Sequence, residues 1–224
     1  MPIDELLNLY DASGSVVGAR PRNEAQQEGF AAGAVQLLLV GGDGRVLLQK
    51  RRADKENGGL WDKSVGGHVL AGESFDEALV REANEELFGS ANAGRVACLD
   101  ATEGLAAVVD SGRAPVVVSP VRTELNLRDV RFASSETGEI INVRYHAAQY
   151  LGATRLPLNA FAPQEEELAG LDWFEFDAVD RMLTRGELAP NMTFLWFALG
   201  HRAAVLARAL RDVATSTIEE EKPS

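Results

Sequence analysis

The sequence predicts an α/β fold in which helices cover a mixed β-sheet. Strand-like and helical stretches interleave along the chain without the regular strand–helix–strand rhythm of a parallel sheet. The length of 224 residues suits one well-buried domain, and the balance of 46% hydrophobic and 25% charged residues is typical of a globular protein. We therefore expect one main domain over residues 30–186 with additions at both ends.

The N-terminal part contains two predicted β-hairpins. Residues Glu5–Arg20 alternate loosely between apolar and polar around the turn cluster Asp11–Gly14, which indicates a hairpin within an appendage of residues 1–29. The apolar run Gly33–Val40 then predicts a central strand. A glycine-rich turn returns the chain into a second strand at Arg45–Gln49.

One helix is predicted with both of its ends. Ser74 stands three residues before Glu77, which is the spacing of a capping box, and apolar residues then recur every four positions. These apolar residues are Phe75, Leu79, Ala83 and Leu87. The pattern predicts a helix from about Phe75 to Phe88.

The remaining elements follow from shorter patterns. Strands are expected at Trp61–Val65, Arg95–Cys98, Val116–Val121, Ile140–Leu151 and Leu171–Phe176, and helices at Asp177–Arg185 and Thr193–Val213. The C-terminal helix, within residues 187–214, is expected to pack on the main domain. The polar residues 215–224 are expected to form a flexible tail.

The charge balance argues against nucleic-acid polymers as partners. The chain carries 34 acidic and 22 basic residues and a formal net charge of −12, so its surface repels polyanions. A small phosphorylated substrate remains compatible with this charge, because a bound cation and a few basic side chains can reverse the field at one site.

Three observations favour a cytoplasmic location. The single cysteine, Cys98, cannot form an internal disulfide, which fits a reducing compartment. The first residues, Met1–Glu5, have neither the basic nor the apolar region of a signal peptide. The most apolar run, Phe194–Leu210, is interrupted by charged residues and is too short to span a bilayer, so no membrane association is expected.

A cluster of glutamates on the predicted helix is the first indication of chemistry. At 100° per residue, Glu82, Glu85 and Glu86 fall within an arc of about 100° on one helix face. Like charges four residues apart destabilise a bare helix, and a bound hard cation would reverse that penalty. The alternative is a solvated helix face, which is the more common reason for three glutamates on a helix.

The residues before the helix favour a site over a solvated face. Gly66 and Gly67 let the backbone approach a cation or phosphate closely. Glu73, just before the helix, can pair with Arg81 and thereby connect the loop to the helix.

This segment resembles the signature of the Nudix hydrolase family, G-x5-E-x7-R-E-U-x-E-E-x-G-U, in which U is a bulky aliphatic residue. The signature's glycine, glutamates and arginine match at the right spacing at Gly67, Glu73, Arg81, Glu82, Glu85 and Glu86. The match departs from the pattern near its end, where Phe88 takes the position of the second glycine and Gly89 follows, and Ala83 is a small aliphatic residue. Since glycine there supplies a left-handed C-terminal cap, we expect the helix to be slightly longer and the carboxylates to be unaffected.

The resemblance implies an α/β/α sandwich and hydrolysis of a phosphate anhydride in a small organic diphosphate, with Mg2+ or Mn2+ as cofactor. By position, Glu82 and Glu86 would be metal ligands together with the carbonyl of Gly66 or Gly67, and Glu85 a ligand or part of the water-activating network. The metal would lower the pKa of a coordinated water and neutralise charge on the phosphoryl oxygens.

The resemblance also implies roles outside the three helix glutamates. Glu73 and Arg81 would support the site as a pair. Family members often carry a further glutamate on a later loop, and here Glu167, before Leu168 and Trp173, is the first candidate, with an acidic loop as the alternative.

Within the family, the segment Leu60–His68 is most similar to the branch of isopentenyl diphosphate isomerase. That isomerase requires a cysteine just before this histidine step, where the chain has Gly66-Gly67-His68. Basic residues precede the segment and could bind substrate phosphates: Lys50, Arg51, Arg52 and Lys55. The alternatives are a solvated loop for these residues and a structural hydrogen bond for His68, which is the other substrate-binding candidate.

Three functions are therefore compared: a pyrophosphohydrolase, an isomerase of an isoprenoid diphosphate, and a non-catalytic nucleotide-binding domain. The missing cysteine disfavours the second and the intact glutamate set disfavours the third. Homodimers are common in the family, so a second copy of the chain is a candidate partner. The substrate cannot be named, because residues 102–115 and 129–138 carry no readable motif.

Overall fold

The computed structural model describes residues 5–25, 31–100, 104–121, 126–133, 140–163 and 168–220. The described strands form one mixed eleven-stranded sheet, whose longest path runs β11-β4-β3-β10-β8-β7. Strand β10 is parallel to β3 and β7 is parallel to β8, whereas the other pairs are antiparallel. The strands are β1 Leu6–Tyr10, β2 Val16–Pro21, β3 Ala31–Gly41, β4 Val46–Arg51, β5 Trp61–Asp62, β6 Val65–His68, β7 Val96–Cys98, β8 Val116–Pro120, β9 Asn126–Ala133, β10 Ile140–Thr154 and β11 Leu168–Phe174.

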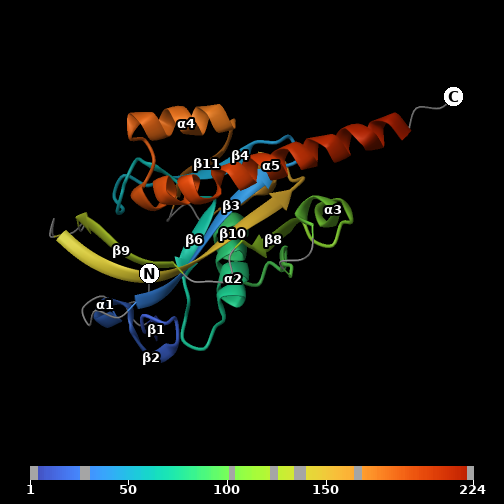
Figure 1. The fold of residues 1–224 in the computed structure, drawn as a ribbon. Coiled ribbons are helices and arrows are strands. Elements are labelled where there is room, and N and C mark those ends of the chain that lie inside the picture. The colour runs from blue at the N-terminus through green and yellow to red at the C-terminus, as the bar shows by residue number, and fades with distance from the viewer. Residues whose placement is uncertain are drawn as a thin grey trace.

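Helices cover both faces of the sheet, as the sequence predicts. The helices are α1 Arg22–Ala25, α2 Phe75–Phe88, α3 Leu105–Asp110, α4 Phe176–Arg185 and α5 Pro190–Glu220, with a short 3-10 turn at Leu158–Ala160. Figure 1 shows α4 and α5 on one side of the strands and α2 on the other. The central strand β3 serves both layers, since Leu38 and Val40 belong to the core under α5 while Leu37 and Leu39 belong to the core under α2. The expected α/β/α sandwich is confirmed.

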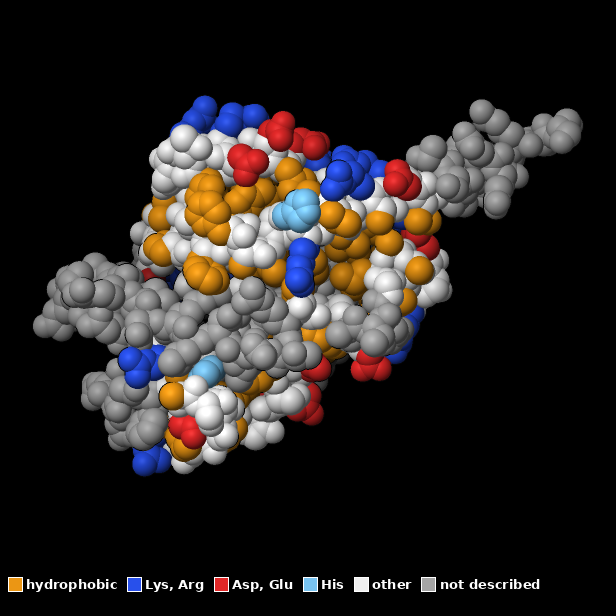
Figure 2. Space-filling view, viewed as in Figure 1, with side chains coloured by type: hydrophobic (Ala, Val, Ile, Leu, Met, Phe, Trp, Pro, Cys, Tyr) orange, Lys and Arg blue, Asp and Glu red, His pale blue; other side chains and the backbone are white. Residues whose placement is uncertain are grey.

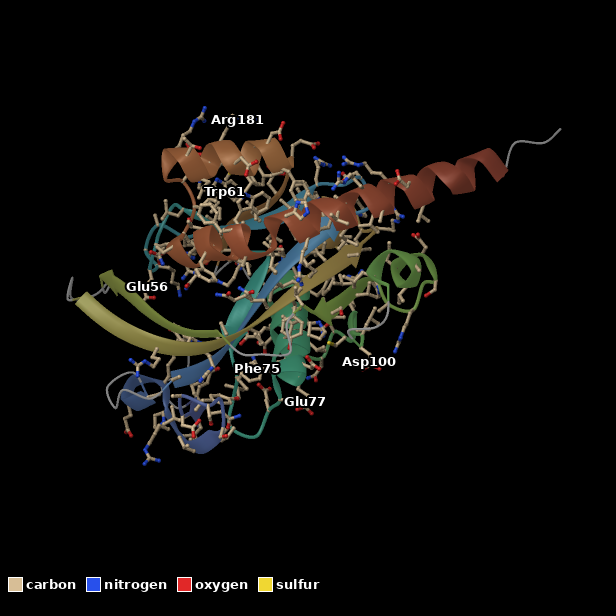
Figure 3. All side chains as sticks on the ribbon, in the orientation of Figure 1. Glu56, Trp61, Phe75, Glu77, Asp100 and Arg181 are labelled. Atoms are coloured by element: carbon tan, nitrogen blue, oxygen red, sulfur yellow. The ribbon has the colours of Figure 1, made fainter. Side chains whose placement is uncertain are left out.

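Helix α2 has the predicted bounds because its end signals are local. The Ser74 hydroxyl accepts a hydrogen bond from the backbone amide of Glu77, and the Glu77 carboxylate accepts one from the backbone amide of Ser74, which completes the capping box. Gly89 closes the helix in the left-handed conformation (φ 73°), as expected from the displaced glycine. Figure 3 labels Phe75 and Glu77 at the end of α2 that lies beside the N-terminal hairpin.

The N-terminal hairpin continues the sheet and contacts the loop before α2. Strand β1 pairs with β2 as predicted, and also with β3 and with Leu70. The buried Asn8 amide donates to the carbonyl of Glu73 (3.1 Å) and accepts from the amide of Gly72 (3.2 Å). The hairpin thus holds the loop that carries the first glutamate of the signature.

Several elements differ from the sequence-based expectation. The expected strand Trp61–Val65 is divided into β5 and β6, because the Ser64 hydroxyl donates to the carbonyl of Leu47 (2.6 Å) and accepts from the amide of Leu39 (2.8 Å), and so replaces a regular ladder. Strand β11 begins three residues earlier than expected, at a register shift between Leu168 and Gly170 that breaks the alternation.

Helix α3 and strand β9 were not expected. Helix α3 lies inside the segment 102–115 and has only six residues, with apolar residues Leu-Ala-Ala-Val-Val that fit a strand equally well. Strand β9, Asn-Leu-Arg-Asp-Val-Arg-Phe-Ala, pairs with β10 although it is highly polar. Both elements are defined by their tertiary neighbours more than by their own pattern.

Helix α5 is longer than the sequence indicated at both ends. It begins at Pro190, because proline suits the first position of a helix, and it extends into the stretch from residue 215 that was expected to be a tail. Its inner face buries Leu195, Trp196 and Leu199, whereas Phe197 on the outer face is 75% exposed. Figure 2 shows hydrophobic side chains gathered on this outer side of the molecule.

The described helices include none that could span a membrane. For α5, charged residues such as Arg202 and Arg208 interrupt its apolar positions.

Candidate active site

Two glutamates of α2 face the glycine pair of β6. A methyl group added to Gly67 would lie 1.9 Å from Cδ and 2.0 Å from Oε1 of Glu82, so the Glu82 carboxyl rests directly on the Gly67 backbone. Glu86 lies one turn further along the helix and accepts a hydrogen bond from the Gly66 amide (3.1 Å). Gly67 is therefore required by the close approach of the Glu82 carboxyl group, whereas at Gly66 a side chain would meet Lys63.

A second contact of Glu86 comes from the sheet. The side-chain amide of Gln49, in β4, donates a hydrogen bond to Glu86 Oε2 (3.2 Å). The other atom of this side chain, Oε1, is buried and has no hydrogen-bond partner among the described residues. An uncompensated acceptor oxygen therefore lies beside the Glu86 carboxyl.

Arg81 connects the loop, the helix and β6. It donates to both oxygens of Glu73 (2.8 and 3.1 Å), which confirms the pair expected from the sequence. It also donates to the backbone carbonyl of His68 (2.9 Å) and contacts Glu82 (2.9 Å) and Glu85 (3.1 Å). Glu73 also accepts a hydrogen bond from the backbone amide of Leu70 in the loop. The Arg81 guanidinium therefore holds the loop, β6 and the glutamates Glu82 and Glu85 in fixed relative positions.

The environment of Glu82 and Glu86 disfavours their ionised forms. Burial raises the pKa of Glu82 to about 7, against a smaller opposing effect of Arg81. Burial, and then the neighbouring Glu82 charge, raises the pKa of Glu86 to about 8, although the Gly66 amide and Lys63 act in the opposite direction. The described cations near these two carboxyl groups, Arg81 and Lys63, thus do not offset the cost of ionising both groups in a buried site.

The donor set fits a hard divalent cation. Mg2+ takes oxygen ligands, commonly one or two carboxylates with the rest of its shell from water and carbonyls. The carboxyl groups of Glu82 and Glu86 lie against the backbone of Gly66 and Gly67, and the Gln49 side chain with its free Oε1 contacts Glu86, so oxygen ligands are available at this position. Within the described part of the chain, no group of three or more His, Cys, Asp or Glu side chains converges as a ready metal site, so backbone oxygens and water would have to complete the shell.

The raised pKa values predict how the metal-free protein responds to pH. A carboxyl group whose pKa is higher in the folded than in the unfolded state stabilises the fold below its unfolded pKa, and this stabilisation is lost as pH rises through the folded pKa. The window for Glu86 runs from the ordinary value of 4.5 to about 8. We therefore expect the melting temperature of chelated protein to fall between pH 5 and 8, and Glu86→Gln to flatten this fall. An equally steep fall in the variant, followed by differential scanning calorimetry, would contradict the assignment.

The predicted substrate-binding residues lie in different settings. Arg51 donates to the carbonyl of Glu56 (2.6 Å) and contacts Asp62 (3.4 Å), so it organises the loop after β4. Arg52 is more exposed and pairs with Asp54 (2.9 Å), and Lys55 is partly exposed in the same loop. The structure thus places Arg52 and Lys55 on the loop surface and Arg51 inward.

His68 ends β6 and its ring lies 5.6 Å from the ring of Tyr145. Burial, with the nearby charges of Arg22, Lys63 and Arg81, lowers the pKa of His68 to about 3. The imidazole is therefore neutral at physiological pH, and it can offer a hydrogen bond to a substrate without adding positive charge.

One predicted residue lies outside the described part of the chain, and three other residues were missed. Glu167 falls in 164–167, which the structure does not describe. The missed residues are Gln49 and the buried pair Asp62 and Lys63, whose ammonium lies 3.3 Å from the carboxylate. Alternation along β4 places Gln49 on the same face as Leu47, toward α2, and two adjacent charges next to Trp61 inside a short strand were a readable signal for the pair.

Comparison with known proteins agrees with this geometry. A family model described as the NUDIX domain matches residues 31–195. An isopentenyl-diphosphate Delta-isomerase of Serratia proteamaculans is 36% identical over 90 residues, which are 40% of this chain and 50% of that protein. An uncharacterized Nudix hydrolase of Streptomyces coelicolor is 40% identical over 88 residues, which are 39% of this chain and 49% of that protein. The chain spans about half the length of the curated relatives that it matches.

The fold also has a counterpart among solved structures. A crystal structure from Deinococcus radiodurans superimposes with a TM-score of 0.52 at 21% identity, covering 85% of this chain and 96% of the other. At that identity the likeness concerns the fold alone. The family model, in contrast, covers well over half of the chain and includes every residue of the glutamate cluster. The chain belongs to the Nudix family.

Proposed function

We propose that the protein is a Mg2+-dependent pyrophosphohydrolase that cleaves the phosphate anhydride bond of a small organic diphosphate. The observation that carries this proposal is the placement of the Glu82 and Glu86 carboxyl groups against the backbone of Gly66 and Gly67, with pKa values raised to about 7 and 8. A cation at this position would remove the energetic cost of ionising both groups. Membership of a family that contains hydrolases supports the same activity.

Two kinds of oxygen ligand would hold the cation. Glu82 and Glu86 would be its carboxylate ligands, with the carbonyl of Gly66 or Gly67 and the free Gln49 Oε1 as neutral donors. When bound, Mg2+ supplies neutralising charge for the phosphoryl oxygens and a more acidic water, and Mn2+ can replace it.

The attacking water needs a group that positions it and accepts its proton. Glu85 is the most exposed of the three helix glutamates, with 35% of its side chain accessible, and Arg81 fixes one of its oxygens. Glu167, in the segment before β11, is the other candidate. Glu73 and Arg81 would keep Glu85 and the metal ligands in position, because they contact the loop before α2 and the His68 carbonyl of β6.

Substrate binding would use the loop after β4. Arg52 and Lys55 would offer charge-assisted hydrogen bonds to the phosphates, while Arg51 binds the carbonyl of Glu56 within the loop. His68, neutral at physiological pH, would contribute a hydrogen bond at the rim formed with Tyr145.

The activity is tested by a phosphate-release screen. Nucleoside diphosphates, nucleotide sugars, dinucleotides and isoprenoid diphosphates would be incubated with the protein, with and without Mg2+ or Mn2+. We expect hydrolysis of at least one class, a requirement for the metal, and a higher rate at mildly alkaline pH, where more of the water and the carboxyl groups are ionised. Full activity after exhaustive chelation would contradict the proposed chemistry.

The isomerase is the second candidate, because several matched relatives carry that name. Residue 66, where the resemblance would place the isomerase cysteine, is a glycine, and the Lys63 side chain fills the space that a residue-66 side chain would need. Cys98 lies on β7, where burial and the nearby Asp76 raise the pKa of its thiol to about 12. We therefore expect no interconversion of isopentenyl and dimethylallyl diphosphate, and an enzymatic rate in that assay would favour the isomerase.

A homodimer and a cytoplasmic location remain expectations. Light scattering on the purified full chain measures the first directly. A mass of twice 24.1 kDa is the expected result for a dimer.

A further inference from the structure

Lys63 is a nearly buried lysine at the edge of the glutamate site. It lies at the break between β5 and β6, and only 11% of its side chain is accessible. A methyl group added to Gly66 would lie 1.9 Å from Cε and 2.8 Å from Nζ of Lys63. The lysine therefore folds over the same glycine whose amide binds Glu86.

The ammonium group has only long contacts among the residues that the structure describes. It contacts both oxygens of Asp62 at 3.3 Å, which is longer than the usual charge-assisted hydrogen bond. Asp62 is shared, since it also contacts Arg51 (3.4 Å) and accepts from the Lys63 backbone amide (2.9 Å). Among the described residues, Asp62 is the one ion-pair partner of an ammonium that has three donor hydrogens.

The charge of Lys63 acts on both sides of the glycine pair. Burial is the main cause of the shifted pKa values of Glu86 and His68, and the Lys63 charge contributes to both. The ammonium is thus within electrostatic range of the carboxyl group at one end of β6 and of the imidazole at the other. Glu86 would hold the cation and His68 is a substrate-binding candidate, so Lys63 lies beside groups that are assigned to the same site.

We infer that Lys63 is a catalytic residue whose ammonium contacts an oxygen of the reacting diphosphate. It would form a charge-assisted hydrogen bond that strengthens as negative charge builds on the phosphoryl group. A cation held on the sheet at the glycine pair is better placed for this than the exposed Arg52 of the neighbouring loop, because its position is fixed by packing. This inference rests on the proposed function, since it assigns a further contact in the same site.

Binding of imidodiphosphate, a diphosphate analogue that is not hydrolysed, tests the inference without requiring turnover. Isothermal titration calorimetry with Mg2+ would compare the unsubstituted protein with Lys63→Gln and Lys63→Arg. We expect Lys63→Gln to weaken binding by about 10-fold or more, as the loss of a hydrogen bond to a charged group does, and Lys63→Arg to restore part of it. With a substrate from the phosphate-release screen, Lys63→Gln should lower kcat by a larger factor than it raises KM.

Two further variants separate a functional role from a structural one. Lys63→Gln removes an ion-pair partner of the buried Asp62 carboxylate and can therefore lower stability. The double variant Asp62→Asn/Lys63→Gln removes both charges, so it keeps the test valid if the single variant is unstable. The double variant should bind imidodiphosphate as weakly as Lys63→Gln. Arg155→Gln is the matched control, because it removes a partly buried cation from an ion pair with Asp110 elsewhere in the fold, and its affinity should match that of the unsubstituted protein.

Unchanged imidodiphosphate affinity in Lys63→Gln and in the double variant would overturn the inference and leave Lys63 as the structural partner of Asp62. Failure of the unsubstituted protein to bind imidodiphosphate would overturn it as well. If imidodiphosphate binds through Lys63 while no compound in the screen is hydrolysed, the proposed function and the catalytic role fail, and Lys63 stands as a diphosphate-binding residue.

Discussion

Glu82→Gln and Glu86→Gln are each expected to lower kcat by about 100-fold or more at moderate Mg2+ concentration, as the loss of a group that holds transition-state charge commonly does. Glutamine keeps the size and helix propensity of glutamate and removes the negative charge. In metal-free protein at pH 8, both variants should be as stable as the unsubstituted chain or more stable, because a carboxyl group with a raised pKa no longer has to ionise. Loss of activity together with retained or increased melting temperature is the signature that separates a metal ligand from a structural residue.

The control for these variants lies on the same helix. Glu77→Gln alters an exposed residue in the first turn, where glutamine also completes a capping box, so both kcat and melting temperature should be retained. Glu73→Gln should behave differently from all three, because weakening the Arg81 pair lowers stability and reduces activity indirectly. Near-normal kcat in both Glu82→Gln and Glu86→Gln at every Mg2+ concentration would contradict their assignment as metal ligands.

Gly67→Ala is expected to have the second large effect. The added methyl group would overlap the carboxyl group of Glu82, whose Cδ lies 1.9 Å from its position, so the Glu82 side chain has to turn away from β6 or the backbone has to shift. We expect a stability loss of about 1 to 3 kcal/mol, which is typical of overpacking, and a fall in kcat of roughly 100-fold from displacement of the carboxylate. Thermal unfolding and steady-state kinetics measure the two effects separately.

Two comparisons show whether the Gly67→Ala effect comes from Glu82. At Gly104 nothing lies within 4 Å of an added methyl group, so Gly104→Ala should leave kcat unchanged. In a Glu82→Ala background, Gly67→Ala should cost much less stability, because the overlapping carboxyl is gone. Equal costs in both backgrounds would mean that the glycine is required for a reason other than the close approach of Glu82.

The parts of the site that lie close together in sequence were predictable. The capping box, the four-residue apolar repeat and Gly89 fix α2 locally, and the Glu73–Arg81 pair spans only eight residues. The orientation of this helix toward Gly66 and Gly67 then follows from packing of its apolar face on β3 and β6.

The parts that come from distant segments were not predictable from pattern alone. Gln49 reaches Glu86 across 37 residues of sequence, and Asn8 reaches the loop before α2 across 64 or more. Lys63 was missed because a regular strand was expected over Trp61–Val65. Ser64 divides that strand, and the break places the Lys63 side chain in a buried position beside Gly66. The sequence therefore contains signals that Gln49 and Lys63 are unusual, but the partners that they meet are decided by tertiary contacts and not by the hydrophobic pattern.

Direct measurement of Mn2+ binding at pH 8 tests the central claim, that Glu82 and Glu86 hold a divalent cation against the backbone of β6. Electron paramagnetic resonance of free Mn2+ during a titration would compare the unsubstituted chain, the double variant Glu82→Gln/Glu86→Gln and the control Glu77→Gln. The proposed site predicts that the unsubstituted chain and Glu77→Gln bind Mn2+ alike and that the double variant binds at least roughly 10-fold more weakly. Equal Mn2+ affinity in all three proteins would contradict it.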